Sequence, residues 1–370
     1  MIPSRAMSAT PSADSVGLST SEKIVMGIGG IATAAVIALK FGGVGEVAIF
    51  VTAALTLVVL AWLLGGATEQ LGEHLGGRVA GFLNATLGNL PELVVVVLLI
   101  NEAKDHPELI DVAKASLIGS VLGNVLFVMG LAFLLGGLRH GTQKFRATFA
   151  NLSSTMLILA LAAIAVPDLI TFQRKEAAQH IPELSVAIAI VLFIVYVAST
   201  FYFLKDGDAA HAPSGGHSAR WSKSMAITVL VFAAVGVGIV SEALVGSMEH
   251  TITEIGISPS FMGFILVPVV GNIAEHLVAV QLAWRNQMDF GVTIALGSSV
   301  QVALFLVPAT LFLSYAIGNP IDLTFEPRQL LAIALAALIV PNLVSDGEST
   351  WIEGLQLLSL YAVIAIGFWY

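Results

Sequence analysis

Two short motifs place an acidic residue in the middle of an apolar run. The first is Gly-Asn-Leu-Pro-Glu at residues 88–92, and the second is Gly-Asn-Ile-Ala-Glu-His at residues 271–276. A carboxylate at the centre of a bilayer costs at least about 2.5 kcal/mol, so such residues are rare and usually functional. The duplication, with matching neighbours, favours a functional role for Glu92 and Glu275 over structural pairing.

The spacing of these motifs puts their polar side chains on one helical face. An asparagine at i and a glutamate at i+3 lie together, and in the second copy His276 at i+4 joins them. We expect Gly88 and Gly271 to loosen the helix before each acid, and Pro91 or Pro268 to free carbonyl oxygens that a cation could use. Broken helices at corresponding positions of two halves are typical of transport sites.

If Glu92 and Glu275 meet in the centre of the membrane, their two carboxylates determine what the site can bind. Two carboxylates in a low dielectric cannot both stay ionised and bare. They need either two protons or one divalent cation, and these states exclude each other. The sequence therefore predicts exchange of a cation for protons.

The ligand set indicates which cation is exchanged. Oxygen donors suit Ca²⁺, which takes about six to eight of them, with Mn²⁺ as the alternative. The predicted cation ligands are Glu92, Glu275, the amide oxygens of Asn89 and Asn272, and backbone oxygens near Gly88 and Gly271. The side chains predicted to orient the acids or line the pathway are Ser120, Asn124, Ser298, Ser299, Gln301, Glu69 and Glu242. Alternatively, the serine, asparagine and glutamine side chains only form hydrogen bonds between helices, and Glu69 and Glu242 lie at the membrane interface.

His276 is a poor ligand for Ca²⁺. An unperturbed imidazole titrates near neutral pH, so His276, together with Glu92 and Glu275, is predicted to handle protons or sense pH. Zn²⁺ is less favoured, because the chain has no cysteine and a single histidine near the motifs.

The composition is that of a polytopic membrane protein. The 370 residues are 57% hydrophobic and 11% charged, with a mean hydropathy of +0.91. The formal charge of −9 gives no basic patch for nucleic acid, and the lack of cysteine excludes disulfides and thiolate metal sites. No resident cofactor is expected, and the partners are the transported ions and the lipid bilayer.

Apolar runs predict an all-α protein with about eleven transmembrane helices. These runs are residues 24–40, 46–67, 79–100, 115–137, 147–166, 184–204, 224–248, 260–284, 290–316, 328–344 and 351–369. Residues 1–22 read as a disordered tail, 23–43 as an extra helix, and 205–223 as a polar linker. Ten of the 16 basic residues fall on the side of the N-terminus. The N-terminus and linker are therefore predicted to be cytosolic and the C-terminus outside, in a prokaryotic inner membrane.

A second pair of matches defines internal symmetry. Gly-Ser-Val-Leu-Gly-Asn at 119–124 is similar to Gly-Ser-Ser-Val-Gln at 297–301. The serines lie 178 positions apart and the motif asparagines 183 apart, in the same order. Residues 44–204 and 224–370 thus form two repeats of five helices. Because five is odd, the second repeat enters the membrane from the opposite face.

These stretches resemble the calcium/proton exchangers within the cation/calcium exchanger superfamily. The similar segments are 67–71 and 83–92 in the first half, and 241–247, 256–258, 271–276 and 297–305 in the second. The resemblance implies one extra helix plus two inverted five-helix repeats, Ca²⁺/H⁺ antiport, and Glu92 and Glu275 as central ligands. It also implies that Glu69 and Glu242 are acids of the access helices.

Three alternatives remain open at this point. One is a passive channel, for which duplicated buried acids with proton competition are unnecessary. Pro91 before Glu92 is similar to the Pro-Glu pair of the sodium-using branch, so an exchanger driven by Na⁺ is the runner-up, although His276 and Gln301 argue against that branch. An intramembrane hydrolase could combine Ser298 or Ser299 with His276 and Glu275, but it gives no reason for a second acid motif. The sequence predicts a transporter and not an enzyme.

Overall fold

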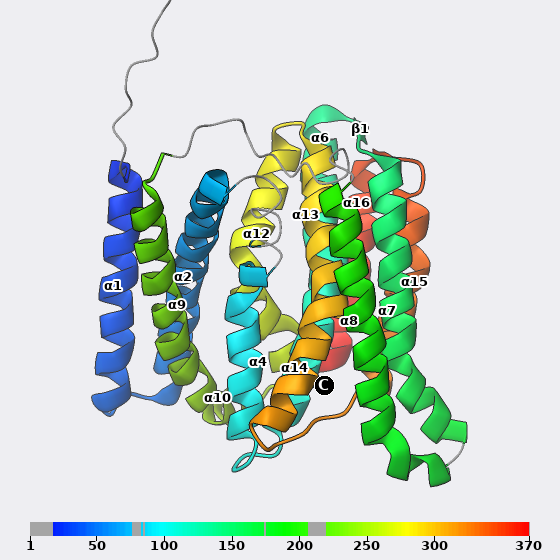
Figure 1. Cartoon of the computed structure of the whole chain (residues 1–370), viewed down its shortest axis with the longest axis horizontal. Helices are drawn as coiled ribbons and strands as arrows, with labels where there is room; N and C mark the ends of the chain where they lie inside the picture. The colour runs from blue at the N-terminus through cyan, green and yellow to red at the C-terminus, as the bar shows by residue number, and fades with distance from the viewer. Residues whose placement is uncertain (1–17, 76–82, 84–85, 174, 206–219, 370) are drawn as a thin grey trace, which may run out of the picture.

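The computed structural model describes residues 18–75, 83, 86–173, 175–205 and 220–369. The described chain is almost entirely helical (Figure 1). Its α-helices are α1 (Thr20–Phe41), α2 (Glu46–Leu75), α4 (Leu90–Glu102), α5 (Leu109–Leu122), α6 (Met129–His140), α7 (Ala147–Gln173), α8 (Ile181–Lys205), α9 (Lys223–Gly246), α10 (Met248–Ile255), α11 (Pro259–Phe261), α12 (Val267–Trp284), α13 (Met288–Gln301), α14 (Val307–Ala316), α15 (Pro327–Val344) and α16 (Trp351–Trp369). The remaining elements are the π-helices η1 (Gly123–Val128), η3 (Met262–Leu266) and η4 (Val302–Leu306), the 3-10 helix η2 (Lys175–His180), and the strands β1 (Gln143–Lys144) and β2 (Glu348–Ser349).

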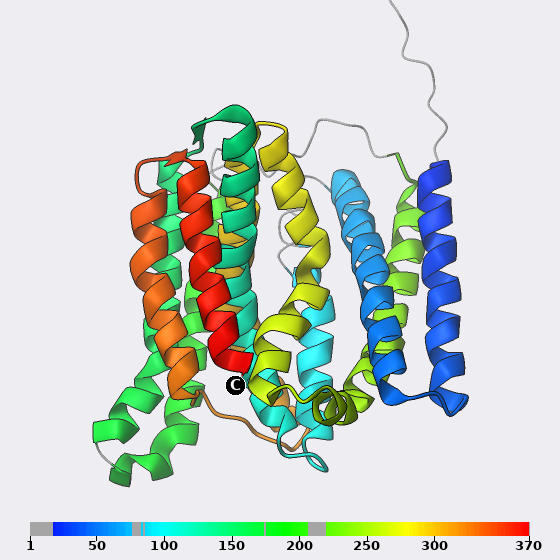
Figure 2. The same ribbon diagram turned by 180° about the vertical axis from the view of Figure 1, so that it is seen from behind.

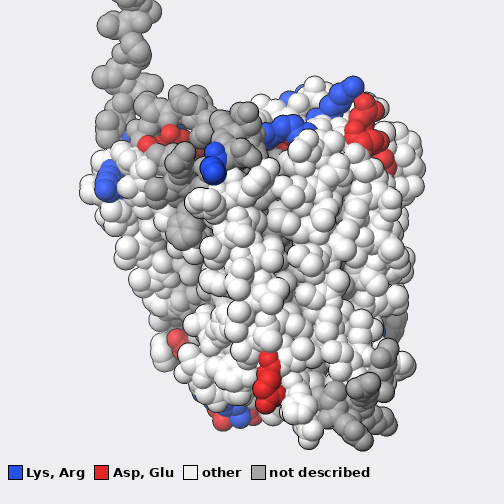
Figure 3. All heavy atoms as spheres, turned by 45° about the vertical axis from the view of Figure 1, so that its right-hand side comes forward, with Lys and Arg blue, Asp and Glu red and all other residues white. Residues whose placement is uncertain are grey.

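The helices present apolar side chains outward as well as inward. Phe172 is 91% exposed and Ile31 is 74% exposed, which a water-facing surface would not favour. On the face shown in Figure 3, charged side chains gather at the two ends of the molecule and leave a broad uncharged band between them. Nine helices in the described part of the chain are long and apolar enough to cross a membrane, or ten if the bent pair around α10 and α12 is one span. The protein is an integral membrane protein.

Two expected boundaries differ from the structure. The helix α1 begins at Thr20 rather than at residue 23, because Ser19 caps it and exchanges hydrogen bonds with Glu22. Part of the expected span 79–100 lies outside the described residues, and α4 provides its second half. Residues 1–17 of the expected tail and 206–219 of the expected linker also lie outside the described residues.

The arrangement is one extra helix followed by two inverted repeats. After α1, the first repeat runs from α2 to α8 and the second from α9 to α16. In Figures 1 and 2, α2 runs toward the end of the molecule that carries the N-terminus, whereas its counterpart α9 runs away from that end. The π-helices η1 and η4 follow the two serine-containing helices and start 179 positions apart, close to the 178 that separate the serines.

The helices fall into two groups. In both views α1, α2 and α9 stand together on one side, and α4, α6, α7, α8 and α12 to α16 occupy the rest of the molecule. We call the first group the three-helix unit and the second the scaffold. Scaffold helices approach very closely: a Cβ atom on Gly354 of α16 would lie 2.2 Å from the backbone nitrogen of Leu134 in α6. Such contacts fix the scaffold helices against one another.

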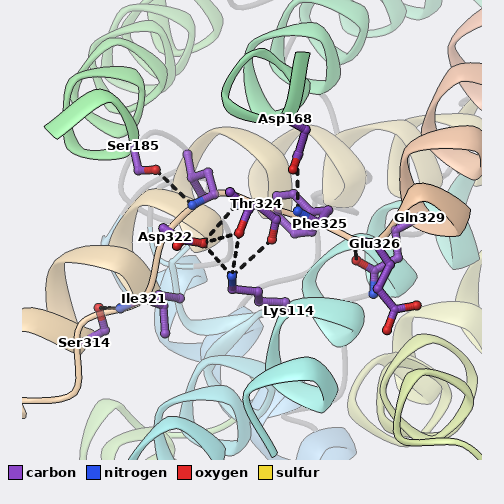
Figure 4. A network of polar contacts seen from close by, with 11 residues as sticks. Lys114, Asp168, Ser185, Ser314, Ile321, Asp322, Thr324, Phe325, Glu326 and Gln329 are labelled. Atoms are coloured by element: carbon purple, nitrogen blue, oxygen red, sulfur yellow. Dashed lines mark hydrogen bonds and ion pairs between the residues drawn. The ribbon is translucent and has the colours of Figure 1, made fainter. Parts of the chain in front are cut away.

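A strap ties the scaffold together at the end opposite the N-terminus. It is the connection 317–326 between α14 and α15, shown in Figure 4. The ammonium of Lys114 in α5 donates to Asp322 Oδ1 at 2.6 Å and to both oxygens of Thr324. Ser185 of α8 accepts from the backbone of Leu323 at 3.0 Å.

Two further contacts complete the strap. Asp168 of α7 accepts from the backbone N–H of Phe325 at 3.1 Å, and Ser260 of α11 donates to Glu326 at 2.7 Å. Helices from both repeats are thus joined through one segment.

A strand pair and an ion pair join helices at the opposite end of the scaffold. Strands β1 and β2 pair antiparallel, with Gln143 opposite Ser349. The carboxylate of Asp289 at the start of α13 accepts from the backbone and the guanidinium of Arg146, each at 2.8 Å. These contacts join α6, α7, α13 and α16 at the end that carries the N-terminus.

The ion pair within the strap generates a prediction about stability. Burial alone would raise the pKa of Asp322, but the Lys114 ammonium and the Thr324 hydrogen bonds hold it below its usual range. The Lys114 side chain is only 12% exposed, so replacing its partner leaves a nearly buried charge. We expect Asp322→Asn to cost about 1–3 kcal/mol and to lower the melting temperature in detergent. At neutral pH the wild-type pair is fully formed, and it weakens only as acid titrates Asp322 below the normal aspartate range.

The matched control is the exposed pair between Lys144 and Glu348, whose side chains are 80% and 45% exposed. Lys144→Gln should leave the melting temperature unchanged, since exposed pairs contribute little. Equal melting temperatures for Asp322→Asn and Lys144→Gln would contradict a structural role for the strap.

Candidate cation site

The first acid lies at a helix start. Gly88 and Asn89 form a turn, and α4 begins at Leu90 with Asn89 as its N-cap. Pro91 occupies the first turn, where its missing N–H costs no hydrogen bond. Glu92 therefore lies at the positive end of the α4 dipole. In Figure 1 the upper end of α4 is about halfway along the molecule. The predicted break before this acid is present at Gly88.

The second acid has a different backbone setting. Gly271 lies within the continuous helix α12, so the expected loosening at this residue is absent. The irregularity comes earlier, at η3 just before Pro268, and in a bend of 118° between α10 and residues 259–273. Gly271 lies beside the first acid, because a Cβ atom there would make an ordinary van der Waals contact of 3.8 Å with the Cβ atom of Glu92. The two motifs thus face each other across α4 and α12.

Asn272 links the two repeats at the first acid. Its amide nitrogen donates to Glu92 Oε2 at 3.3 Å and to the Ser120 hydroxyl oxygen at 3.2 Å. All three side chains are at most 2% exposed. A residue of the second motif therefore orients the acid of the first motif, as well as the serine of the first repeat.

Asn124 makes the reciprocal link at the second acid. Its amide nitrogen donates to Ser298 Oγ at 3.0 Å, and its carbonyl oxygen lies 3.1 Å from His276 Nε2. Because that oxygen can only accept, Nε2 of His276 carries the proton in this arrangement. Ser298 in turn contacts Glu275. His276 thus reaches the acid through Asn124 and Ser298, and its imidazole edge also packs on Phe127.

A third cross-repeat bond completes the polar layer. The Asn89 amide nitrogen donates to Gln301 Oε1 at 3.0 Å. The amide oxygen of Asn89 takes no part in this hydrogen bond. Nine of the residues predicted from the sequence are therefore in one polar layer, in which all but the half-buried Glu275 and Gln301 are buried: Asn89, Glu92, Ser120, Asn124, Asn272, Glu275, His276, Ser298 and Gln301.

Three buried oxygens in this layer have no hydrogen-bond partner. They are Asn89 Oδ1, Glu92 Oε1 and Glu275 Oε2. Glu92 and Glu275 are close enough to repel each other electrostatically. Each unsatisfied buried polar group costs about 1–3 kcal/mol, and more when it is charged. Protons on the acids or a hard cation between them would remove that cost.

The other predicted residues lie outside this layer. Ser299 donates to the backbone oxygens of Ala295 and Val121, which is interhelical hydrogen bonding. Glu69 is exposed toward the end of α2, and Glu242 is 66% exposed and paired with Lys40 at 2.8 Å. These two acids lie near opposite ends of the molecule, and their role in access stays a prediction.

Sequence reasoning missed the glycines that set the spacing of the site. A Cβ atom on Gly119 would lie 2.2 Å from the backbone oxygen of Phe264, and one on Gly263 would lie 2.3 Å from that of Val112. The backbones of α5 and η3 are therefore in direct contact beside Ser120. The available signal was the position of Gly119 directly before Ser120 in the serine motif. From composition alone, this glycine reads as one of many that serve general helix packing.

This fold and this layer define a class: a polytopic membrane protein whose two inverted repeats enclose a cluster of buried oxygen atoms without hydrogen-bond partners. Comparison with known proteins agrees. Residues 45–205 and 225–370 match the sodium/calcium exchanger protein family. The chain belongs to this family.

Curated relatives and solved structures are similar over most of the chain. A Ca²⁺/H⁺ antiporter of Synechocystis is 37% identical over 89% of this chain and 92% of its own. The Ca²⁺/H⁺ antiporter ChaA of Bacillus subtilis is 35% identical over 86% of this chain and 91% of its own. The structure of native YfkE superposes with a TM-score of 0.79 at 33% identity, covering 94% of this chain and 99% of that one.

The contact between α5 and η3 generates a prediction. Gly119→Ala forces two backbones apart, and overpacking of this kind costs about 1–3 kcal/mol or more. We expect a clear fall in melting temperature in detergent. Gly123 in the next turn and Gly297 in the second repeat have open space around them, so Gly123→Ala and Gly297→Ala are matched controls. A Gly119→Ala protein as stable as these controls would rule out the direct backbone contact.

Proposed function

We propose that this protein exports cytosolic Ca²⁺ in exchange for H⁺ by alternating access, with both ions competing for Glu92 and Glu275. The observation that carries the proposal is the set of three buried unpaired oxygens on Asn89, Glu92 and Glu275. An all-oxygen set suits Ca²⁺, with water and backbone oxygens completing its shell. Relatives named Ca²⁺/H⁺ antiporters support the choice of ions.

The competition between ions provides the coupling. Ca²⁺ needs both carboxylates ionised, whereas protons neutralise them one by one, so each ion expels the other. With two protons per Ca²⁺, one pH unit supplies about 2.7 kcal/mol, equivalent to a roughly 100-fold Ca²⁺ gradient. Asn272, Ser120, Asn124, Ser298 and Gln301 hold the ligands in place during this exchange. The pH-sensing role of His276 stays a prediction.

The direction of transport follows from the expected topology. We place the N-terminus in the cytosol and the C-terminus outside, since ten of the 16 basic residues belong to the loops on the N-terminal side. The bacterial relatives support a plasma membrane as the location. Glu242 then serves the outer access path and Glu69 the cytosolic one.

The first test is ⁴⁵Ca²⁺ uptake into proteoliposomes with an acidic lumen. Uptake that a proton ionophore abolishes establishes Ca²⁺/H⁺ antiport. Uptake that requires a Na⁺ gradient instead refutes proton coupling and assigns the chain to Na⁺-driven exchange. Competition by Mn²⁺ in the same assay measures the preference between the two divalent ions.

Substitution of the two carboxylates is the most direct test of the proposed site. Glu92→Gln and Glu275→Gln keep the size of each side chain but remove a charge that Ca²⁺ needs, so each should abolish pH-driven uptake while the protein still folds. Glu348→Gln, on an exposed acid of β2, is the matched control and should transport normally. Retained exchange in either buried variant would refute the two-carboxylate site.

Asn89 should affect affinity more than turnover. Asn89→Ala removes one neutral oxygen ligand and leaves both carboxylates, so we expect KM for Ca²⁺ to rise about tenfold, which corresponds to ~1.4 kcal/mol. Asn101→Ala in the same helix α4 is the control, because Asn101 is exposed and its side-chain oxygen accepts from Lys104 at 3.2 Å. An unchanged KM in Asn89→Ala would remove this residue from the ligand set.

A further inference from the structure

A second group of metal-ligating side chains lies away from the polar layer. In the described part of the chain, His106, Glu108 and Glu249 bring one ligand atom each to within 4.8 Å of the others. Glu92 and Glu102 are ten residues apart in α4, which corresponds to a rise of about 15 Å, and His106 follows the end of that helix. The group is therefore separate from the two carboxylates of the proposed exchange.

The first two of these ligands belong to the connection between α4 and α5. The backbone N–H of His106 donates to the backbone oxygen of Glu102 at 3.1 Å, and the backbone oxygen of His106 accepts from Leu109 at 3.0 Å. Leu109 is buried at the start of α5 and anchors the connection. Pro107 stands between His106 and Glu108 and restricts the backbone there, so the spacing of the two ligands is set before any ion binds.

The third ligand comes from the other repeat. Glu249 lies in the first turn of α10, which buries Met248, Thr251 and Ile252 as one helical face. The Thr251 hydroxyl donates to the backbone oxygen of Ser247 at 2.7 Å and fixes this turn. Figures 1 and 2 show α10 at the end of the molecule opposite the N-terminus. Both repeats thus contribute ligands at the end that we expect to face outside.

The distances suit a small transition-metal ion. His106 Nδ1 lies 3.0 Å from Glu249 Oε2 and 3.7 Å from Glu108 Oε1. Tetrahedral Zn²⁺ with bonds of about 2.0–2.2 Å places its ligand atoms about 3.4 Å apart, which falls between these two distances. The three side chains are 38% to 47% exposed, so an ion can enter from water and keep a water molecule as its fourth ligand. A nitrogen with two carboxylates favours Zn²⁺ over Ca²⁺, which takes about six to eight oxygens.

The protons and charges around the group also permit a divalent ion. Because carboxylate oxygens only accept, Nδ1 of His106 carries the proton in this arrangement. A metal takes the place of that proton, and the neutral imidazole then carries its proton on Nε2. Lys104 of the same connection donates to Asn101 at 3.2 Å and to the backbone oxygen of Ile317 at 2.7 Å, so its ammonium is already engaged. A divalent ion then balances the charges of the two glutamates.

We propose that His106, Glu108 and Glu249 bind a transition-metal ion such as Zn²⁺, and that the bound metal slows exchange by joining the two repeats at this end. Metal binding does not depend on which ions the protein transports. The effect on rate rests on the alternating access put forward above. A metal that holds the α4–α5 connection to α10 binds one separation of these segments more tightly than others, so it shifts the protein toward that state.

The site is tested by titration calorimetry of the full-length protein in detergent with Zn²⁺. His106→Gln and Glu249→Gln each remove a ligand and should weaken Zn²⁺ binding at least about tenfold. His250→Gln is the matched control, because this neighbouring histidine is 63% exposed and pairs with Glu254 instead. It should bind Zn²⁺ like the wild type. Equal affinities in the wild type, His106→Gln and Glu249→Gln would overturn the site.

Co²⁺ distinguishes this site from any metal bound by the central carboxylates. Co²⁺ accepts the same nitrogen and oxygen ligands, and its visible absorption reports tetrahedral coordination. We expect Glu92→Gln to keep this absorption and His106→Gln to lose it. The reverse result would place the metal in the polar layer and overturn the proposal.

The effect on exchange is tested by ⁴⁵Ca²⁺ uptake driven by pH, with and without Zn²⁺. In the wild type and in His250→Gln, Zn²⁺ should lower the maximal rate several-fold. In His106→Gln, the maximal rate should be unchanged, and any competition at the central carboxylates raises only KM for Ca²⁺. Equal slowing of all three proteins would overturn the inhibitory role. Absence of uptake before Zn²⁺ is added counts against the proposed function instead, and the calorimetry still tests the site.

Discussion

The structure depends on the cost of leaving carboxylate oxygens buried without partners. Asn272 satisfies one oxygen of Glu92, while the other, like one oxygen of Glu275, has no protein donor. In a low dielectric such groups are stable only with a proton or a cation. The proposed exchange follows from this constraint, because these oxygens have no protein donor and a proton or a cation would complete the site.

That constraint requires a surrounding structure that cannot collapse onto the site. If side chains could relax, a nearby hydroxyl or amide would satisfy the free oxygens and remove the need for an ion. The backbone contact at Gly119, the strap at Asp322 and the pair between Arg146 and Asp289 oppose this relaxation. Asn89 shows the result: Gln301 engages its nitrogen, which leaves its oxygen free for a ligand.

The sequence was sufficient to predict the fold class and most of the polar layer, because duplicated motifs around Glu92 and Glu275 must meet if the repeats are inverted. It was insufficient where partners are remote. Lys114 and Asp322 are 208 positions apart, and Glu22 lies 198 positions from Arg220, so neither pair leaves a local pattern. The break expected at Gly271 is absent because a single glycine does not by itself interrupt a helix, and the irregularity lies at η3 just before Pro268.

The two repeats are symmetric in topology and unequal in electrostatics. Glu92 lies at the start of α4, where the helix dipole stabilises its charge, whereas Glu275 lies inside α12 without that help. The positions that correspond to Asn124 and His276 in the other repeat are Val302 and Leu93, so the chain from His276 through Asn124 to Ser298 has no counterpart. Because the two acids differ in these surroundings, the two halves of the polar layer are not equivalent, although the topology of the repeats is. Any difference between the two acids in the proposed exchange therefore resides in side chains that the symmetry of the fold does not repeat.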